Sequence, residues 1–112
     1  MKLVGRVARA ALEGGAMVRL AYPPFDVLVA IVNGAPRAIE DACNHAGASL
    51  SEGWLTDDGA RVVCPMHNYE FDFGSGECVS PKGLCDAQRT FVARVEGADV
   101  AIYEPVMITL LR

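Results

Sequence analysis

Two histidines occur in the chain of 112 residues, and each follows a cysteine at short range. Cys43 precedes His45 by two positions, and Cys64 precedes His67 by three. A thiolate and an imidazole this close together can bind a metal from one loop, and a second loop of the same kind completes a set of four ligands. We therefore expect a metal centre held by these four side chains.

The same four residues fit either one zinc ion or a cluster of two irons and two sulfides. Zinc accepts two thiolates and two imidazoles in a closed tetrahedral site. In common zinc fingers, however, the cysteines come as one pair and the histidines as another, whereas here each loop supplies one of each. A two-iron cluster with thiolates on one iron and imidazoles on the other suits this mixed order, because each loop then gives one ligand to each iron.

The sequence on either side of these loops indicates β-strands. Period-two alternation and β-branched residues indicate extended segments, which turn formers such as Asn33-Gly34 and Asp58-Gly59 separate. A short helix of a turn or two is expected over residues 7–13, before Gly14. The pattern predicts a single all-β domain over residues 1–112. Its expected strands span 3–8, 17–22, 27–32, 37–40, 61–64, 69–73, 91–95 and 100–103.

Composition and charge indicate which classes of partner the protein can bind. The chain is 52% apolar and 21% charged, as expected for one domain with a hydrophobic core. Its net charge of -4 disfavours nucleic acid and anionic membranes as partners. Charged residues interrupt the N-terminal segment, so we expect neither a signal peptide nor a membrane span and place the protein in the cytoplasm. Residues 40–78 contain eight acids against Arg61 alone, which predicts a negative field on one part of the surface.

The two motifs and their flanks resemble the Rieske iron-sulfur family. The matching residues are Cys43-x-His45-x-Gly47, then Cys64-Pro65-x-His67, Phe71-Asp72 and Gly74-x-Gly76-Glu77, with residues 27–30 upstream and Ser80-Pro81 downstream. Within that family the chain is most similar to the small ferredoxins of ring-hydroxylating dioxygenase systems. The resemblance implies an antiparallel β base built from the N- and C-terminal thirds, with a cluster-binding subdomain inserted at about residues 43–84.

The resemblance also implies a function. One Rieske-type 2Fe-2S cluster is expected on Cys43, His45, Cys64 and His67, and no residue is expected to be catalytic. Such a protein is an electron carrier and not an enzyme. It takes one electron from a flavin-dependent ferredoxin reductase and passes it to a terminal oxygenase, docking transiently as a monomer.

Departures from the family pattern carry their own expectations. Ala48 and Met66 occupy the positions where high-potential Rieske proteins have a disulfide, so no bridge between the loops can form. High-potential Rieske proteins also place a serine and a tyrosine hydroxyl near the cluster, and the matching positions here are Tyr69 and Phe71. Fewer hydroxyl groups then donate hydrogen bonds to the cluster sulfurs, so we expect a reduction potential near the lower end of the Rieske range of about -150 to +300 mV. Asn68 replaces a glycine after the second histidine, and asparagine tolerates a positive φ.

Three residues outside the motif are expected to have structural roles. Cys78 is expected to pack in the core and Cys85 to lie in a loop by chance, with a disulfide between them as the minor alternative. Trp54 is expected to form a hydrophobic plug beneath the first loop.

Three other functions compete with this interpretation. An oxygenase needs further histidines for a mononuclear iron, and both histidines are already used. The small subunit of an assimilatory nitrite reductase shares the fold, but many such subunits lack the cluster ligands. A zinc-stabilised binding module would have no redox function and no colour.

Overall fold

The computed structural model describes residues 1–44, 47–80, 82 and 85–105. Over these residues the fold is antiparallel β structure with two short 3-10 helices, η1 (Arg9–Gly15) and η2 (Leu50–Glu52), which confirms the all-β prediction. Within the described residues, no helix is both long enough and apolar enough to cross a membrane.

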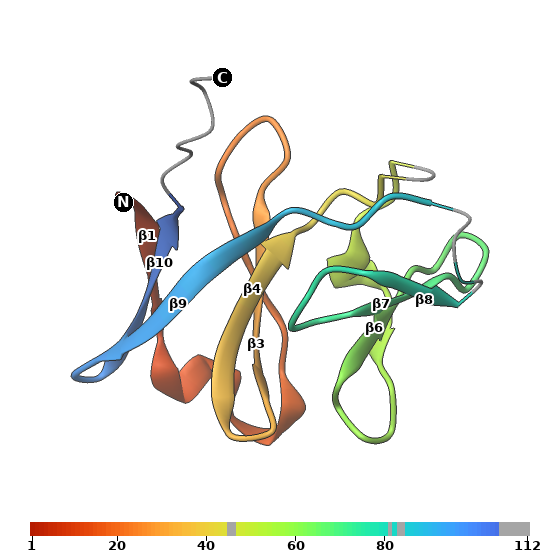
Figure 1. Cartoon of the computed structure of the whole chain (residues 1–112). Coiled ribbons are helices and arrows are strands. Elements are labelled where there is room, and N and C mark those ends of the chain that lie inside the picture. The colour runs from red at the N-terminus through yellow and green to blue at the C-terminus, as the bar shows by residue number, and fades with distance from the viewer. Residues whose placement is uncertain (45–46, 81, 83–84, 106–112) are drawn as a thin grey trace.

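Six strands form the larger sheet, which we call the base sheet, in the order β1-β10-β9-β4-β3-β2 (Figure 1). All six were expected from the sequence, with ends that differ by a few residues. Their bounds are β1 Lys2–Ala8, β2 Val18–Leu20, β3 Val27–Val32, β4 Ala35–Glu40, β9 Thr90–Glu96 and β10 Asp99–Glu104.

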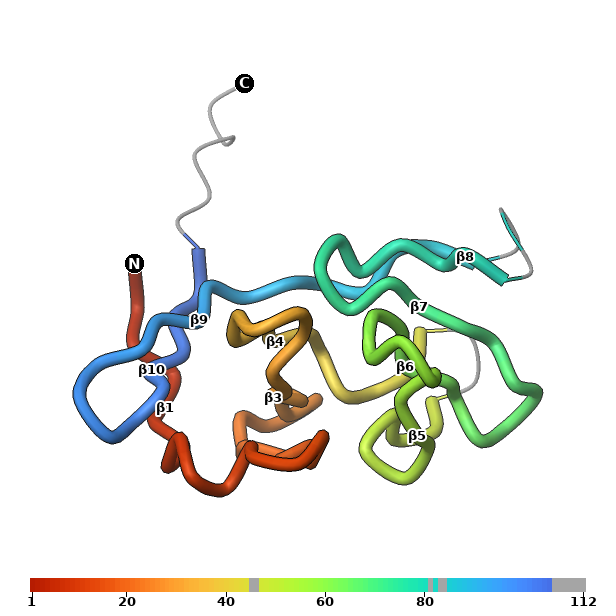
Figure 2. The backbone as a smooth tube through the Cα atoms, turned by 90° about the horizontal axis from the view of Figure 1, so that it is seen from below, coloured from red at the N-terminus to blue at the C-terminus, as the bar shows by residue number. Residues whose placement is uncertain are grey.

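Four strands form the smaller sheet, which we call the lobe sheet, in the order β5-β6-β7-β8. Their bounds are β5 Trp54–Leu55, β6 Arg61–Val63, β7 Glu70–Asp72 and β8 Cys78–Ser80. In sequence the lobe sheet lies between β4 and β9, and in space the two sheets lie side by side (Figure 2). Strands β5 and β8 were not expected from the sequence, because their five residues include only one β-branched residue, Val79.

Strand β3 separates two hydrophobic clusters, which explains its continuous apolar sequence. Successive side chains of a strand point to opposite faces. Val27 and Val29 pack in a cluster with buried residues of β1, β9 and β10, whereas Leu28 and Ala30 pack in a second cluster that contains three of the four cysteines. Both faces of β3 are therefore buried, as in strands covered on two sides. The base sheet thus provides one wall of the core beneath the motif loops.

Tight turns join the strands at the positions that the sequence indicated. The β3–β4 turn has φ of 52° at Asn33 and 82° at Gly34, and Gly97 at the β9–β10 turn has φ of 65°. Two consecutive residues with positive φ are typical of the hairpin turns that match strand twist. The expected helix is η1, whose Leu12 is buried in the cluster on the β1 side of β3.

Candidate metal centre

The two cysteine motifs form hairpin loops with the same backbone hydrogen bonds. In the first loop (residues 43–48), Cys43 N–H donates to the Ala48 carbonyl at 2.7 Å, and Gly47 N–H donates to the Cys43 carbonyl at 2.7 Å. In the second loop (residues 64–69), Cys64 N–H donates to the Tyr69 carbonyl at 2.8 Å, and Asn68 N–H donates to the Cys64 carbonyl at 3.0 Å. The two cysteines therefore occupy equivalent positions in matched loops.

A left-handed residue closes each loop at the same point. The fourth residue after the cysteine has φ of 74° at Gly47 and 58° at Asn68. Glycine adopts this conformation without a steric penalty, and asparagine is among the residues that tolerate it best. The backbone therefore accommodates asparagine in place of the usual glycine, as expected from the sequence.

The thiols of Cys43 and Cys64 are buried and close together. Each residue is only 2% exposed, and the two side chains are in hydrogen-bonding contact. Burial raises the pKa of the Cys64 thiol, and contact with Cys43 raises it further, while a backbone hydrogen bond at Met66 opposes both effects. Two thiolates side by side in a buried site repel each other, so a metal cation is needed to hold both in the ionised form.

His67 and the residues around it lie at the surface. Pro65, Met66, His67 and Asn68 are all exposed, so this loop carries its cysteine inward and its histidine outward. His45 lies outside the described residues. In the part of the chain that the structure describes, three of the four predicted ligands therefore belong to the two loops. No group of three or more histidine, cysteine or acidic side chains among the described residues is by itself arranged as a site for a single metal ion.

This donor set fits a two-iron cluster. Thiolates on one iron should be buried, because exposure of the sulfurs admits water, whereas histidines on the other iron can lie at the surface. The described residues show the buried thiol pair and one exposed imidazole on matched loops. The structure therefore agrees with the donor chemistry that a Rieske-type cluster requires.

A close backbone approach places the β5 strand against the second loop. A Cβ atom on Gly53 would lie 1.8 Å from the carbonyl oxygen of Val63, the residue before Cys64. Only glycine fits here, although its φ is negative. Trp54 follows and is 50% exposed, so the expectation that it plugs the core beneath the first loop was wrong. On the two-residue strand β5 its side chain faces solvent, and Leu50 instead is fully buried beneath the loop.

Two buried polar side chains near the first loop were not expected from the sequence. Among the described residues, only Asp41 and Gln88 are both polar and buried. Asp41 accepts a hydrogen bond from Ser51 N–H at 2.8 Å, and its other carboxylate oxygen lies 3.5 Å from Arg19 Nε. Gln88 bonds to Asn44 between the two ligands of the first loop. A single sequence holds no signal for either role, since each depends on contacts that only the fold creates.

The remaining cysteines, Cys78 and Cys85, contact each other. All four cysteines of the chain are free thiols, Cys78 is buried, and Cys85 is half-buried. Burial raises the pKa of the Cys85 thiol to about 12, and hydrogen bonding with Cys78 contributes to the increase. Cys78 packs in the core as expected, and no disulfide joins the pair.

We predict that Cys85 reacts slowly with alkylating reagents. With a pKa near 12, its thiolate population at pH 8 is roughly a thousandfold below that of a thiol with an ordinary pKa. Iodoacetamide treatment of the cluster-loaded protein, followed by mass spectrometry, measures the rate. Labelling of Cys85 as fast as that of free cysteine would contradict the prediction, and Cys85→Ser identifies the labelled position.

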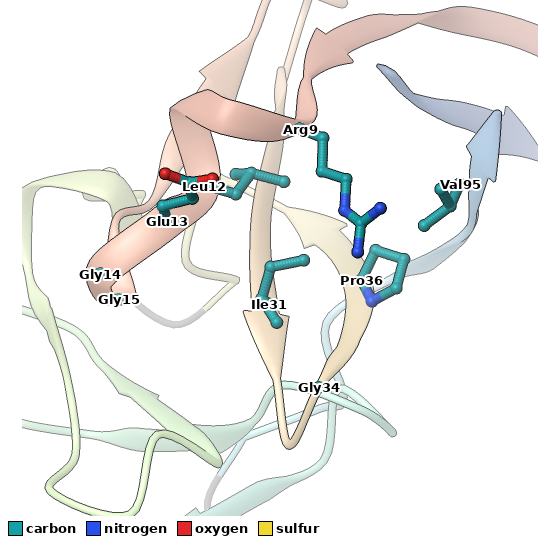
Figure 3. A pocket seen from close by; sticks show the side chains of 9 residues that line it. All are labelled: Arg9, Leu12, Glu13, Gly14, Gly15, Ile31, Gly34, Pro36 and Val95. Carbon is teal, nitrogen blue, oxygen red and sulfur yellow. The ribbon is translucent and has the colours of Figure 1, made fainter. Parts of the chain in front are cut away.

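A pocket among the described residues lies away from the two loops. It has a volume of about 410 Å³ and lies between η1, the β3–β4 turn and β9, with Leu12, Ile31 and Pro36 in its wall (Figure 3). Arg9 and Glu13 also line it. None of the four cysteines lines this pocket, so it is separate from the candidate metal centre.

Comparison with known proteins identifies relatives over most of the chain. The family model described as "Rieske [2Fe-2S] domain" matches residues 6–91. The chain is 38% identical over 91 residues to the ferredoxin component of biphenyl 2,3-dioxygenase from Rhodococcus jostii (strain RHA1), covering 81% of this chain and 82% of the relative. It is 42% identical over 78 residues to the 3-phenylpropionate/cinnamic acid dioxygenase ferredoxin subunit of Escherichia coli (strain K12), covering 66% and 68%.

A solved structure shows the same fold. The chain superposes with a TM-score of 0.79 and 26% identity on a chain from the complex of reduced oxygenase and oxidized ferredoxin in carbazole 1,9a-dioxygenase. The match covers 94% of this chain and 97% of that one. The antiparallel architecture described above is thus shared with a protein of known structure.

Proposed function

Because the chain belongs to the Rieske [2Fe-2S] domain family, we propose that it transfers one electron from a flavin-dependent ferredoxin reductase to a terminal oxygenase. The protein is an electron carrier, like the ferredoxin components to which it is similar, and it carries one Rieske-type 2Fe-2S cluster. The observation that carries the proposal is the pair of matched loops, which bury two thiols and expose a histidine.

We assign Cys43 and Cys64 to one iron and His45 and His67 to the other. The contact between the buried thiols supports the first assignment, and the exposed position of His67 supports the second. When bound, the cluster supplies a store for one electron. The chain holds the thiol side away from water and presents the histidine side to a partner, which gives electrons a short path out.

The arrangement suits brief contacts with partners. Residues 65–68 are exposed as a group, and a small interface allows the rapid dissociation that a carrier needs. We place the cluster-binding subdomain at about residues 43–84 of a single domain, and we propose a monomer in the cytoplasm.

A reconstituted assay tests the proposal. The cluster-loaded protein should take up one electron per chain in a dithionite titration, and it should accelerate electron flow from NADH and a ferredoxin reductase to cytochrome c. It should not hydroxylate an aromatic compound by itself. Uptake of two electrons or none, or no acceleration with a fully loaded protein, would contradict the proposal.

Acidic side chains on the surface support electrostatic steering toward the partner. Of the eight acids between residues 40 and 78, three pair with arginine: Glu40 with Arg89, Asp41 with Arg19, and Glu70 with Arg61. Four others are exposed: Glu52, Asp57, Asp58 and Glu77. Exposed charges of one sign attract a partner surface of the opposite sign and raise the association rate.

We therefore predict that salt slows reduction of this protein by its reductase. Screening shortens the range of the field to about 8 Å at physiological ionic strength and to about 3 Å at 1 M. The second-order rate constant, measured by stopped flow from about 0.01 M to about 1 M salt, over which the screening length falls from about 30 Å to about 3 Å, should decrease steadily. A rate constant that does not change with salt would show that steering is unimportant.

The comparisons favour this function over the alternatives. The relatives described above are ferredoxin components of dioxygenases, which supports an oxygenase partner more than the small subunit of an assimilatory nitrite reductase. A zinc-stabilised module does not fit a member of the Rieske [2Fe-2S] family.

A further inference from the structure

The two matched loops are supported very differently by the strands next to them. The second loop connects β6 to β7, which form a ladder of three residue pairs ending at Val63 and Glu70. At the first loop, the equivalent pair is Ala42 and Ser49, which form an isolated bridge with no strand ladder behind it. The first loop therefore needs support from side chains to hold the same shape.

Gln88 supplies that support from outside the loop. Its Nε2 group donates to the Glu40 carbonyl at 2.8 Å and to the Ala42 carbonyl at 2.7 Å. Its Oε1 atom accepts from Asn44 N–H at 2.8 Å and also from the Asn44 side-chain amide. Both amide hydrogens and both lone pairs of Gln88 are thus used, in a side chain that is only 3% exposed.

The backbone of Gln88 is itself held tightly. Gln88 N–H donates to the Gly76 carbonyl at 2.7 Å, and a Cβ atom on Gly76 would lie 2.2 Å from the Gln88 carbonyl oxygen. The next residue, Arg89, accepts a hydrogen bond from Glu40 N–H at 2.8 Å through its carbonyl. The segment before β9 therefore contacts the end of β4, the β7–β8 turn and the first loop together. In Figure 1 this segment leads from the lobe sheet to β9 of the base sheet.

The only other buried polar side chain of the described residues supports the other side of the same loop. Asp41 accepts from Ser51 N–H through its carboxylate, and its carbonyl accepts from Leu50 N–H at 2.8 Å. Buried polar groups that are fully hydrogen-bonded specify one conformation, because leaving any partner unpaired costs free energy. Both buried polar side chains, Asp41 and Gln88, therefore lie next to the first loop, which has no strand ladder behind it.

We propose that Gln88 is a positioning residue for the cluster, which holds the segment bearing Cys43 and His45 by bonding Asn44 between them. This inference rests on the proposed ligand assignment. Gln88 does for the first loop what the β6–β7 ladder does for the second. Its loss should affect the first loop and leave the second in place.

The test compares Gln88→Met with the wild-type protein, both loaded with cluster. Methionine fills a similar volume but offers neither the two donors nor the acceptor. Hydrogen exchange measured by mass spectrometry should increase in peptides covering residues 41–50 and stay unchanged over residues 62–71. Iron release to a ferrous chelator should become about tenfold faster, as is typical when a group that orients a metal ligand is removed. The paramagnetic resonance spectrum and the midpoint potential should shift.

Two further variants keep the test decisive if Gln88→Met fails to fold. Asn44→Ala removes only the side-chain bonds to Gln88 and to the Asp86 carbonyl, and should give the same changes at smaller size. Val100→Ala, in the buried core on the β10 side, lowers stability without touching this network and should leave exchange at 41–50, spectrum and potential unchanged.

The outcomes separate the inference from the function on which it rests. If wild-type protein binds a cluster but Gln88→Met and Asn44→Ala leave exchange, spectrum and release rate as they were, Gln88 has no positioning role. If Val100→Ala changes them equally, the effect is general destabilisation and the inference is again wrong. If the wild-type protein binds no cluster, the proposed function fails, while exchange of residues 41–50 still reports on the support of the loop.

Discussion

Replacing His67 with cysteine should change the cluster's spectrum and lower its midpoint potential by on the order of hundreds of millivolts. An imidazole is a neutral ligand, whereas a thiolate is an anion, and added negative charge disfavours reduction. His67 is on the exposed edge of the second loop, so the substitution disturbs no buried packing. The paramagnetic resonance spectrum of the reduced variant, together with a redox titration, measures both effects. His45→Cys should act in the same direction.

Matched controls come from the two cysteines outside the loops. Cys78→Ser and Cys85→Ser change a thiol to a hydroxyl in the same lobe, and they should leave spectrum and potential close to those of the wild-type protein. A His67→Cys variant with an unchanged spectrum and potential would show that His67 does not bind iron. A large change in Cys78→Ser or Cys85→Ser would show that the ligand set includes the wrong cysteines.

The substitution Gly76→Ala should destabilise the protein by at least about 3 kcal/mol. Gly76 has φ of 79°, and an added Cβ atom would lie 2.2 Å from the backbone carbonyl oxygen of Gln88. Because that neighbour is backbone, it can move only by displacing the segment that joins the lobe to β9. Chemical denaturation gives the change in unfolding free energy.

Gly59→Ala is the matched control for the backbone conformation. Gly59 has a similar φ of 72°, but an added Cβ atom would meet nothing within 4 Å. Its substitution should cost only about 1 kcal/mol, the penalty of the left-handed conformation alone. Equal losses in the two variants would mean that the close approach at Gln88 contributes nothing.

Sequence reasoning succeeded where the signal is local. The turn at Asn33-Gly34 and the strands of the base sheet are both visible within short windows of sequence. The left-handed conformation at Asn68 was also predictable, because few other residues tolerate it. The sequence also predicted two loops of the same kind, but only the backbone hydrogen bonds show that the two cysteines occupy equivalent positions in them.

Features that depend on long-range contacts could not be predicted from the sequence. Gln88 and Asn44 are 44 positions apart in the sequence, and no local pattern links them. Trp54 was assigned to the core because tryptophan usually buries much of its surface, but a two-residue strand at the sheet edge leaves it 50% exposed. Such outcomes depend on which elements meet in the fold, and one sequence does not record that.

Paramagnetic resonance of the dithionite-reduced protein, with iron, zinc and sulfide determined on the same sample, tests the central claim most directly. We predict a red-brown protein that contains two irons and two sulfides per chain, with one unpaired electron per cluster after reduction. A colourless protein with one zinc ion per chain, or iron without sulfide and no signal after reduction, would contradict the assignment of a Rieske-type electron carrier.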